Sequence, residues 1–151
     1  MQPLFRPLSA DDLDAMLVVE QAAHVHPWSR RLLADSFGER YITGSLWLPE
    51  QGLKERLLGY FIADRILDES TLMNICVSPG QQGGGLGRQL MEHYLRLCER
   101  QGLTRLWLEV RESNIAARAL YLSCGYVESG RRRHYYQGIT GPEDAIMMNK
   151  C

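Results

Sequence analysis

The sequence lacks any long hydrophobic run. No stretch approaches the roughly 18–20 consecutive apolar residues that a membrane-spanning helix needs, and the opening residues, MQPLFRPLSADD, contain no apolar segment of the kind found in secretory signal peptides. Charge of either sign is not in excess: the formal net charge is -1, so no overall field attracts the protein to nucleic acid or to a membrane. These absences predict a cytoplasmic protein that binds neither nucleic acid nor a membrane directly.

Cysteine is scarce, and its spacing is not that of a metal site. The four cysteines, at positions 76, 98, 124 and 151, include no C-x-x-C pair, and none stands near a histidine at zinc-finger spacing. Cys76 and Cys98 lie in apolar periodic segments, so we expect them to be small buried hydrophobic residues. The pattern favours a reduced protein without a metal.

The remaining composition is that of one globular domain, and we expect residues 1–151 to form it. A chain of 151 residues can bury roughly 68–70% of its unfolded surface, and no repeat or linker divides it. Hydrophobic periodicity predicts strands and helices in a mixed order. The expected strands are a short one before Ser9 and those at 41–48, 56–66, 70–79, 103–112, 126–136 and 144–150; the expected helices run to about Ala23, then over 30–38, 87–102 and 113–125.

The least ordinary stretch is SPGQQGGGLGRQLMEH, residues 78–93, in which glycines 83, 84, 85 and 87 stand directly before a helix. Glycine loses much conformational entropy on folding, so we expect something to approach this backbone closely. A strand, a glycine-rich turn and a helix N-terminus together form an anion site. No lysine follows as in a P-loop, and the order of a dinucleotide fingerprint is absent. A flexible glycine loop is the alternative.

The glycine stretch is part of a longer pattern. Residues 82–87, QGGGLG, fit Q/R-x-x-G-x-G/A; VSP precedes them at 77–79, and SN…A…LY…GY follows between 113 and 126. In this order and at these separations the segments resemble the GCN5-related N-acetyltransferases (GNAT), which bind acetyl-coenzyme A (acetyl-CoA) at that loop. Longer stretches, including AHVHPWS, GERY, LDESTLMNICVSP and LWLEVRESNIAARALY, are similar to the RimI branch, from about Leu8 to Met148. Two departures are visible: Gly83 stands where the family often has Arg or Lys, and residues 51–55 lengthen a turn.

The resemblance implies the fold and the cosubstrate. The fold would be α/β (α+β), with a mixed, mostly antiparallel sheet of about seven strands and about four helices. The strands on either side of the glycine-loop helix would splay apart to admit the pantetheine arm of acetyl-CoA. The residues implied to bind it are Asn114, the backbone of Ile75, Cys76 and Val77, and the loop and helix start at Gly83, Gly84, Gly85, Leu86, Gly87 and Arg88.

The resemblance also implies the reaction. RimI enzymes acetylate the N-terminal alanine of small-subunit ribosomal protein 18, so the expected acceptor is a protein N-terminal amine and the expected mechanism is direct transfer in a ternary complex. Two other functions stay open. The fold serves many acceptors, so a small-molecule amine or a lysine is one alternative, and a non-catalytic acyl-CoA-binding module is another. We expect a monomer or a weak dimer.

Glu109 is the expected general base. An α-amino group has a pKa of roughly 7.7–8.0, so a modest base suffices to deprotonate it. Alternation in LWLEV places Trp107 and Glu109 on one face of a strand that is otherwise apolar, and desolvation there would raise the pKa of the carboxyl group. A solvent-facing or arginine-paired glutamate is the alternative, and the resemblance favours the base.

Tyr121 is the expected general acid, which would protonate the departing thiolate. Helical spacing puts it on one face with Ala117, as a core residue would be, and the resemblance again favours the catalytic role. Asn114 fits an N-cap as well as a contact to coenzyme A. Cys76 is not expected to act as a nucleophile, because no histidine is placed to activate it.

Two further segments have open interpretations. The break containing His24, His26 and Trp28 is either a packed loop or, as the resemblance implies, part of the groove for the incoming peptide. Residues 131–134, RRRH, form a solvated strand end or contact the ribosome or peptide, and Tyr135 and Tyr136 are placed to close over a substrate N-terminus.

Overall fold

The computed structural model describes residues 2–50, 55–138 and 140–151, so most of the turn at 51–55 lies outside the described residues. The α-helices are α1 (Leu13–Ala23), α2 (Arg30–Ala34), α3 (Leu86–Arg100) and α4 (Ile115–Ser123). The strands are β1 (Leu4–Arg6), β2 (Tyr41–Leu48), β3 (Arg56–Asp64), β4 (Glu69–Val77), β5 (Arg105–Arg111), β6 (Val127–Gly138) and β7 (Gly141–Lys150). Short 3₁₀ turns are η1 (Ala10–Asp12), η2 (Asp35–Phe37) and η3 (Pro79–Gln81).

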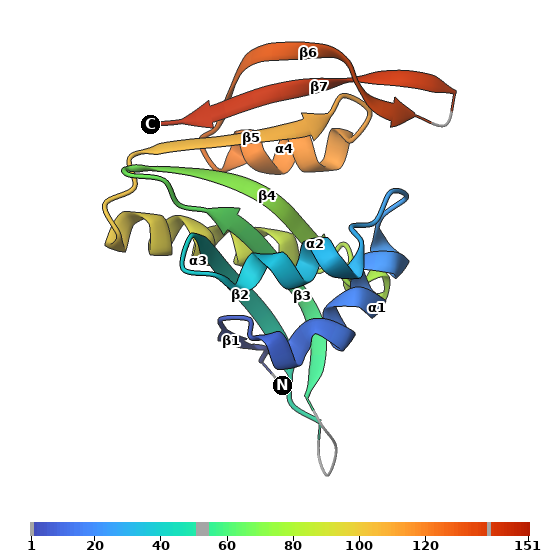
Figure 1. The fold of residues 1–151 in the computed structure, drawn as a ribbon, viewed down its shortest axis with the longest axis vertical. Coiled ribbons are helices and arrows are strands. Elements are labelled where there is room, and N and C mark those ends of the chain that lie inside the picture. The colour runs from blue at the N-terminus through green and yellow to red at the C-terminus, as the bar shows by residue number, and fades with distance from the viewer. Residues whose placement is uncertain (1, 51–54, 139) are drawn as a thin grey trace.

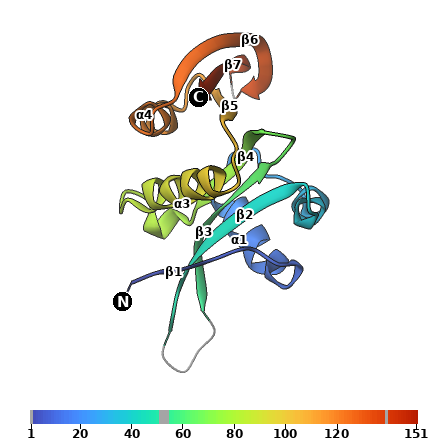
Figure 2. The same ribbon diagram turned by 90° about the vertical axis from the view of Figure 1, so that its left-hand side faces the viewer.

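The strands form one sheet in the order β1-β2-β3-β4-β5-β7-β6. Every neighbouring pair is antiparallel except β4 and β5, which are parallel. A parallel pair needs a crossover connection, and α3 supplies it. Helices α3 and α4 lie on one side of the sheet and α1 and α2 on the other (Figures 1 and 2). The expected mixed sheet of about seven strands with four helices is confirmed.

Each face of the sheet has its own apolar core. The core on the α3 side contains the helical stripe predicted from residues 90–98, with Leu90, Met91, Tyr94 and Cys98 buried. The smaller core under α1 contains Met16, Val19, Tyr60 and Cys76, among others. Cys76 and Cys98 are buried and free, as expected. No helix in the described parts of the chain is long and apolar enough to cross a membrane.

Strand β4 separates from β5 partway along its length. The parallel pairing runs from Glu69 only to Leu72, whose partner is Leu108. On its other side, the register against β3 shifts between Leu72 and Asn74, which leaves Met73 as an extra residue. Such a bulge turns the following side chains to the opposite face. The strands therefore splay beyond Leu72, as expected, and this gap is the feature around which the candidate site is built.

Candidate active site

The four glycines of the loop between β4 and α3 differ in whether the backbone conformation requires them. Gly83 and Gly85 have φ angles of 84° and 83°, a region that other residues rarely adopt. A Cβ at Gly87 would lie 3.4 Å from Leu120 on α4, and a Cβ at Gly84 would lie 3.5 Å from the Gln81 carbonyl oxygen. Both are ordinary van der Waals distances, so the protein's own packing does not require glycine at either position. Backbone conformation therefore explains Gly83 and Gly85, and it leaves Gly84 and Gly87 unexplained by the protein itself.

The loop delivers the chain to the N-terminus of α3. The first N–H groups of this 15-residue helix have no partners within the helix, and its dipole favours an anion at this end. The side-chain amide of Gln82 donates to the Val77 carbonyl at 3.2 Å and so fastens the loop to the end of β4. Arg88, one of the predicted binding residues, donates to the Ser123 hydroxyl on α4. The loop and helix start therefore have the backbone arrangement expected of an anion site.

The β4 edge of the gap offers backbone groups. The Ser78 N–H donates to the Leu58 carbonyl on β3, and Cys76 is paired with Tyr60 on the same strand. Because backbone groups alternate in direction along a strand, those of Ile75 and Val77 point away from β3, toward the gap. Of the three predicted residues, Cys76 has its backbone groups directed at β3 instead.

The Cys76 thiol is not poised for nucleophilic attack. It is buried on the α1 side and donates to the Val19 carbonyl at 3.7 Å. Burial, followed by the charge of Glu20, raises the pKa of the Cys76 thiol to about 12. A thiol that keeps its proton at neutral pH is a poor nucleophile, which agrees with the expectation that no acyl-enzyme forms here.

Glu109 lies on β5 across the gap, facing away from the α3 core as the alternation predicts, since Leu106, Leu108 and Val110 are in that core. Its carboxylate is 3.0 Å from Nε of Arg132 on β6, and about a quarter of its side chain is exposed (24%). The surroundings are therefore not the apolar ones expected from the strand alone. The reason is the β5-β7-β6 order, which places the basic strand β6 one strand beyond β7, so that Arg132 reaches Glu109.

Tyr121 is buried on α4, with its ring centroid 6.1 Å from that of Tyr126. Burial, followed by the charge of Tyr136, raises the pKa of Tyr121. The pKa of Tyr136 is itself raised by burial and then by the charge of Glu109. Tyr136 is thus a common neighbour of Glu109 and Tyr121. A tyrosine that retains its proton at neutral pH can serve as an acid.

The segment predicted to be a solvated strand end, residues 131–134, is exposed on β6. Two of its arginines are nevertheless engaged: Arg131 is 2.9 Å from Asp144 and 3.0 Å from Glu112, and Arg132 holds Glu109. A bulge follows Arg132, in which His134 adopts a φ of 54°. The ring of Tyr136 beyond the bulge packs against the Arg111 guanidinium at 4.4 Å.

Asn114 caps α4 by accepting the Ala117 N–H on its side-chain oxygen at 3.1 Å, as its position predicts. Replacing an N-cap residue by alanine costs about 1 kcal/mol. We therefore expect Asn114→Ala to lower the free energy of unfolding by about 1 kcal/mol in a urea titration. Ser113→Ala is the control, because its backbone N–H, at 3.1 Å from Glu143, is the group that makes the contact. Equal stability of Asn114→Ala and wild type would contradict the capping role.

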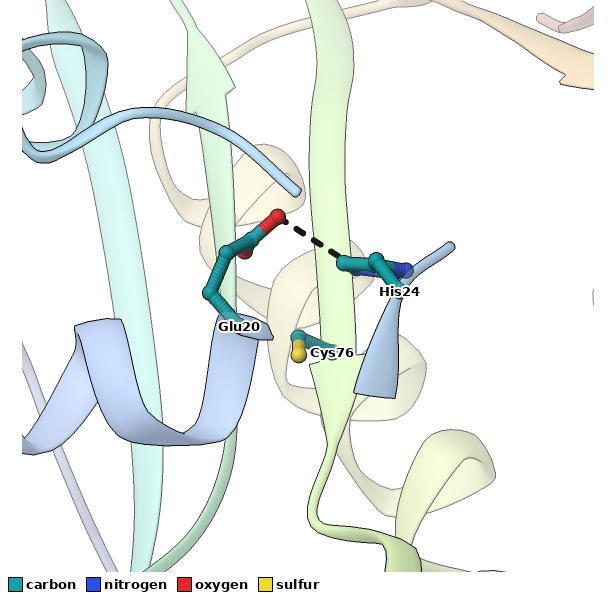
Figure 3. A group of neighbouring side chains, drawn as sticks. All are labelled: Glu20, His24 and Cys76. Atoms are coloured by element: carbon teal, nitrogen blue, oxygen red, sulfur yellow. Dashed lines mark ion pairs between the residues drawn. The ribbon is translucent and has the colours of Figure 1, made fainter. Parts of the chain in front are cut away.

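Sequence reasoning missed Glu20, a fully buried carboxylate on α1. Its Oε1 accepts from the Tyr60 hydroxyl at 2.5 Å and from the Asn74 amide at 2.8 Å, and its Oε2 accepts from the Trp28 N–H at 2.9 Å. Figure 3 shows its carboxylate directed at His24, 3.8 Å away. The helical spacing of Met16, Val19, Glu20 and Ala23 on one face was the available signal.

Glu20, His24 and Cys76 are also a group of possible metal ligands, with ligand atoms within 4.8 Å of one another (Figure 3). Both carboxylate oxygens of Glu20 already accept hydrogen bonds from the protein. A metal would have to displace these donors and remove the proton from a thiol whose pKa is about 12. The arrangement fits a hydrogen-bonded cluster better than a ligand set, and a site that needs no metal stays our prediction.

Known proteins are similar to this chain in both sequence and fold. The profile of the acetyltransferase (GNAT) family matches residues 13–126. The [ribosomal protein bS18]-alanine N-acetyltransferase of Escherichia coli K12 is 45% identical over 93% of this chain and 92% of its own. The protein of that name from Haemophilus influenzae is 39% identical over 95% and 94%. The crystal structure of the E. coli ribosomal-protein-S18-alanine N-acetyltransferase superposes with a TM-score of 0.91, 43% identity and coverage of 98% of this chain and 92% of that one. With its glycine loop, splayed strands and matching profile, the chain belongs to the GNAT family of acetyltransferases.

Proposed function

We propose that this protein transfers the acetyl group of acetyl-CoA to the N-terminal alanine of ribosomal protein bS18. The observation that carries the proposal is the 45% identity, over 93% of the chain, to a curated bS18-alanine N-acetyltransferase. A relative of the same name at 39% identity supports it. The two residues expected to carry acid–base chemistry, Glu109 on β5 and Tyr121 on α4, are both present in the chain, which argues against a non-catalytic binding module.

The described residues suit acetyl-CoA. The N-terminus of α3 and the loop over Gly83–Gly87 would hold the pyrophosphate, because free N–H groups and the helix dipole converge there. Ile75 and Val77 would pair with the amide groups of the pantetheine arm, in the way that an added strand pairs with a sheet edge. The side-chain oxygen of Asn114 already accepts the capping hydrogen bond, so its side-chain NH₂ group would be the part that contacts coenzyme A.

The chemistry follows from the two titratable residues. The lone pair of the neutral α-amine attacks the acetyl carbonyl carbon, and Glu109 accepts the proton that the amine nitrogen then loses, directly or through a water molecule. As the carbon–sulfur bond breaks, Tyr121 donates its hydroxyl proton to the departing sulfur. The ion pair with Arg132 orients the Glu109 carboxylate. Burial keeps Tyr121 protonated, as its role requires.

Peptide kinetics test the acceptor. Thiol release from acetyl-CoA would be measured with a peptide that begins with the N-terminal alanine of bS18 and lacks lysine. The matched peptide has a blocked N-terminus and one added lysine. We expect turnover on the free N-terminus alone. Turnover on the lysine peptide alone would overturn the proposed acceptor while leaving the fold and cosubstrate intact.

The glycine loop gives a matched pair of variants. Gly84→Ala meets no protein atom closer than 3.5 Å and needs no positive φ, so we expect unchanged stability and acetyl-CoA binding weakened by roughly tenfold or more if phosphates approach this backbone. Gly85→Ala imposes a left-handed conformation that costs about 1–2 kcal/mol, so we expect it to lower the melting temperature. Calorimetric titration and thermal melts measure both. Unchanged acetyl-CoA affinity in Gly84→Ala would contradict close approach of the cosubstrate at this loop.

A further inference from the structure

The buried Glu20 carboxylate is not used by the chemistry proposed above. A buried charge destabilises a fold unless it is paired or well hydrogen-bonded, and here donors from three different segments converge on it. They are Tyr60 on β3, Asn74 on β4 and the backbone of Trp28. Glu20 therefore ties the segment that follows α1 to the middle of the sheet.

The segment His24–Ser29 has few other anchors. Val25, His26 and Pro27 are exposed, and proline has no N–H to donate. Trp28 packs against the core under α1, and the Ser29 hydroxyl accepts from the Leu32 N–H on α2 at 3.2 Å. Among the described residues, the segment's side-chain-mediated hydrogen bonds to α1 and β4 are the Trp28 N–H to Glu20 and His24 Nε2 to the Asn74 side-chain oxygen at 3.2 Å. Both of these bonds belong to the Glu20 cluster, so the cluster fixes where the segment lies relative to β4.

The cluster stands beside the gap. Asn74 follows the bulge at Met73, in the part of β4 that has lost its β5 partner. Its side chain points to the α1 side, where it meets Glu20. Glu109 also faces away from the α3 core, so the cluster and the expected base share one face of the sheet. The groups suited to acetyl-CoA are instead backbone atoms of β4 and the start of α3.

We propose that Glu20 is a positioning residue for the acceptor: its carboxylate fixes His24–Ser29 beside the gap, so that this segment forms one wall of the peptide site. This inference rests on the proposed function. Glu20 would then affect the affinity for the acceptor peptide and not the affinity for acetyl-CoA.

Glu20→Gln is the sharpest test because the two oxygens of Glu20 have different donors. The glutamine carbonyl can keep the place of Oε1, which serves Tyr60 and Asn74. Its NH₂ group then faces the Trp28 N–H, so donor meets donor and the segment is released. We expect the KM for the bS18 peptide to rise roughly tenfold or more, as for a lost hydrogen bond to a charged group, while the Kd for acetyl-CoA stays within about twofold.

Tyr94→Phe is the matched control. It removes a buried hydroxyl that bonds Ser70 at 2.6 Å on the opposite face of the sheet, so it should lower the melting temperature without changing either constant. If Glu20→Gln does not fold, His24→Ala replaces it, since His24 is partly exposed and makes the other bond of the segment; the same rise in peptide KM alone is expected.

The outcomes separate the two proposals. Wild-type turnover with an unchanged peptide KM in the folded variant would overturn the role of Glu20 alone. Parallel losses of peptide and acetyl-CoA affinity would also overturn it, because they indicate a general structural role. Absence of wild-type turnover on the peptide would overturn the proposed function and, with it, this inference.

Discussion

Glu109→Gln is expected to lower kcat by about 10²–10⁴-fold, the usual contribution of a general base. The amide cannot accept the proton of the attacking amine. The ion pair that the substitution breaks, to Arg132, is partly exposed, and such pairs contribute about 0–1 kcal/mol. The melting temperature should therefore change little, and the loss should appear in initial rates of thiol release at saturating peptide.

Glu112→Gln is the control for this prediction. Glu112, three positions after Glu109, also pairs with a β6 arginine, Arg131, at 3.0 Å. Its substitution therefore removes a negative charge and an ion pair, as Glu109→Gln does. We expect its kcat to stay close to that of wild type. Equal effects of the two substitutions would mean that ion pairing with the arginines of β6, and not proton transfer by Glu109, supports activity.

Tyr121→Phe is expected to reduce kcat by about 10²–10⁴-fold as well, because the sulfur then leaves without a proton donor. Burial and the neighbouring Tyr136 raise the pKa of Tyr121, so its hydroxyl keeps its proton up to at least its ordinary pKa of about 10. Any loss of wild-type activity between neutral pH and about pH 10 should consequently not come from Tyr121. A kcat–pH profile with the wild type and Tyr121→Phe checks both points.

Tyr126→Phe is the comparison variant. Its ring neighbours that of Tyr121, and its buried hydroxyl has no hydrogen-bond partner among the described residues. Removing an unsatisfied buried hydroxyl should leave kcat unchanged and raise stability by about 1–3 kcal/mol. A loss of activity in Tyr126→Phe as large as that in Tyr121→Phe would show that ring packing, and not proton donation, is what the site requires.

Local patterns in the sequence predicted much of this fold. The apolar spacing over 90–98 anticipated the buried face of α3, and the alternation in LWLEV placed Glu109 opposite Leu108. Asn114 was identified as a cap from its position alone. These features depend on residues a few positions apart, which is the range over which periodicity and capping act.

Features that depend on distant pairing were not predicted. The bulge at Met73 arises from the register between β3 and β4. An arginine pair for Glu109 was the alternative interpretation, but its partner, Arg132, could not be identified without knowing that β7 lies between β5 and β6. The three donors to Glu20 come from positions as far as 54 residues away. The sequence did contain one signal for Glu20: it is a charged residue at a position on the otherwise apolar face of α1.

Mapping the acetyl group on full-length bS18 tests the proposed acceptor most directly. Recombinant bS18 with a free N-terminus would be incubated with acetyl-CoA and the wild-type protein, and tandem mass spectrometry would locate the modified nitrogen. We expect acetylation of the α-amine of the N-terminal alanine, and none with Glu109→Gln over the same time. Acetylation confined to lysine side chains, or none on bS18 under conditions where acetyl-CoA binds, would contradict this expectation.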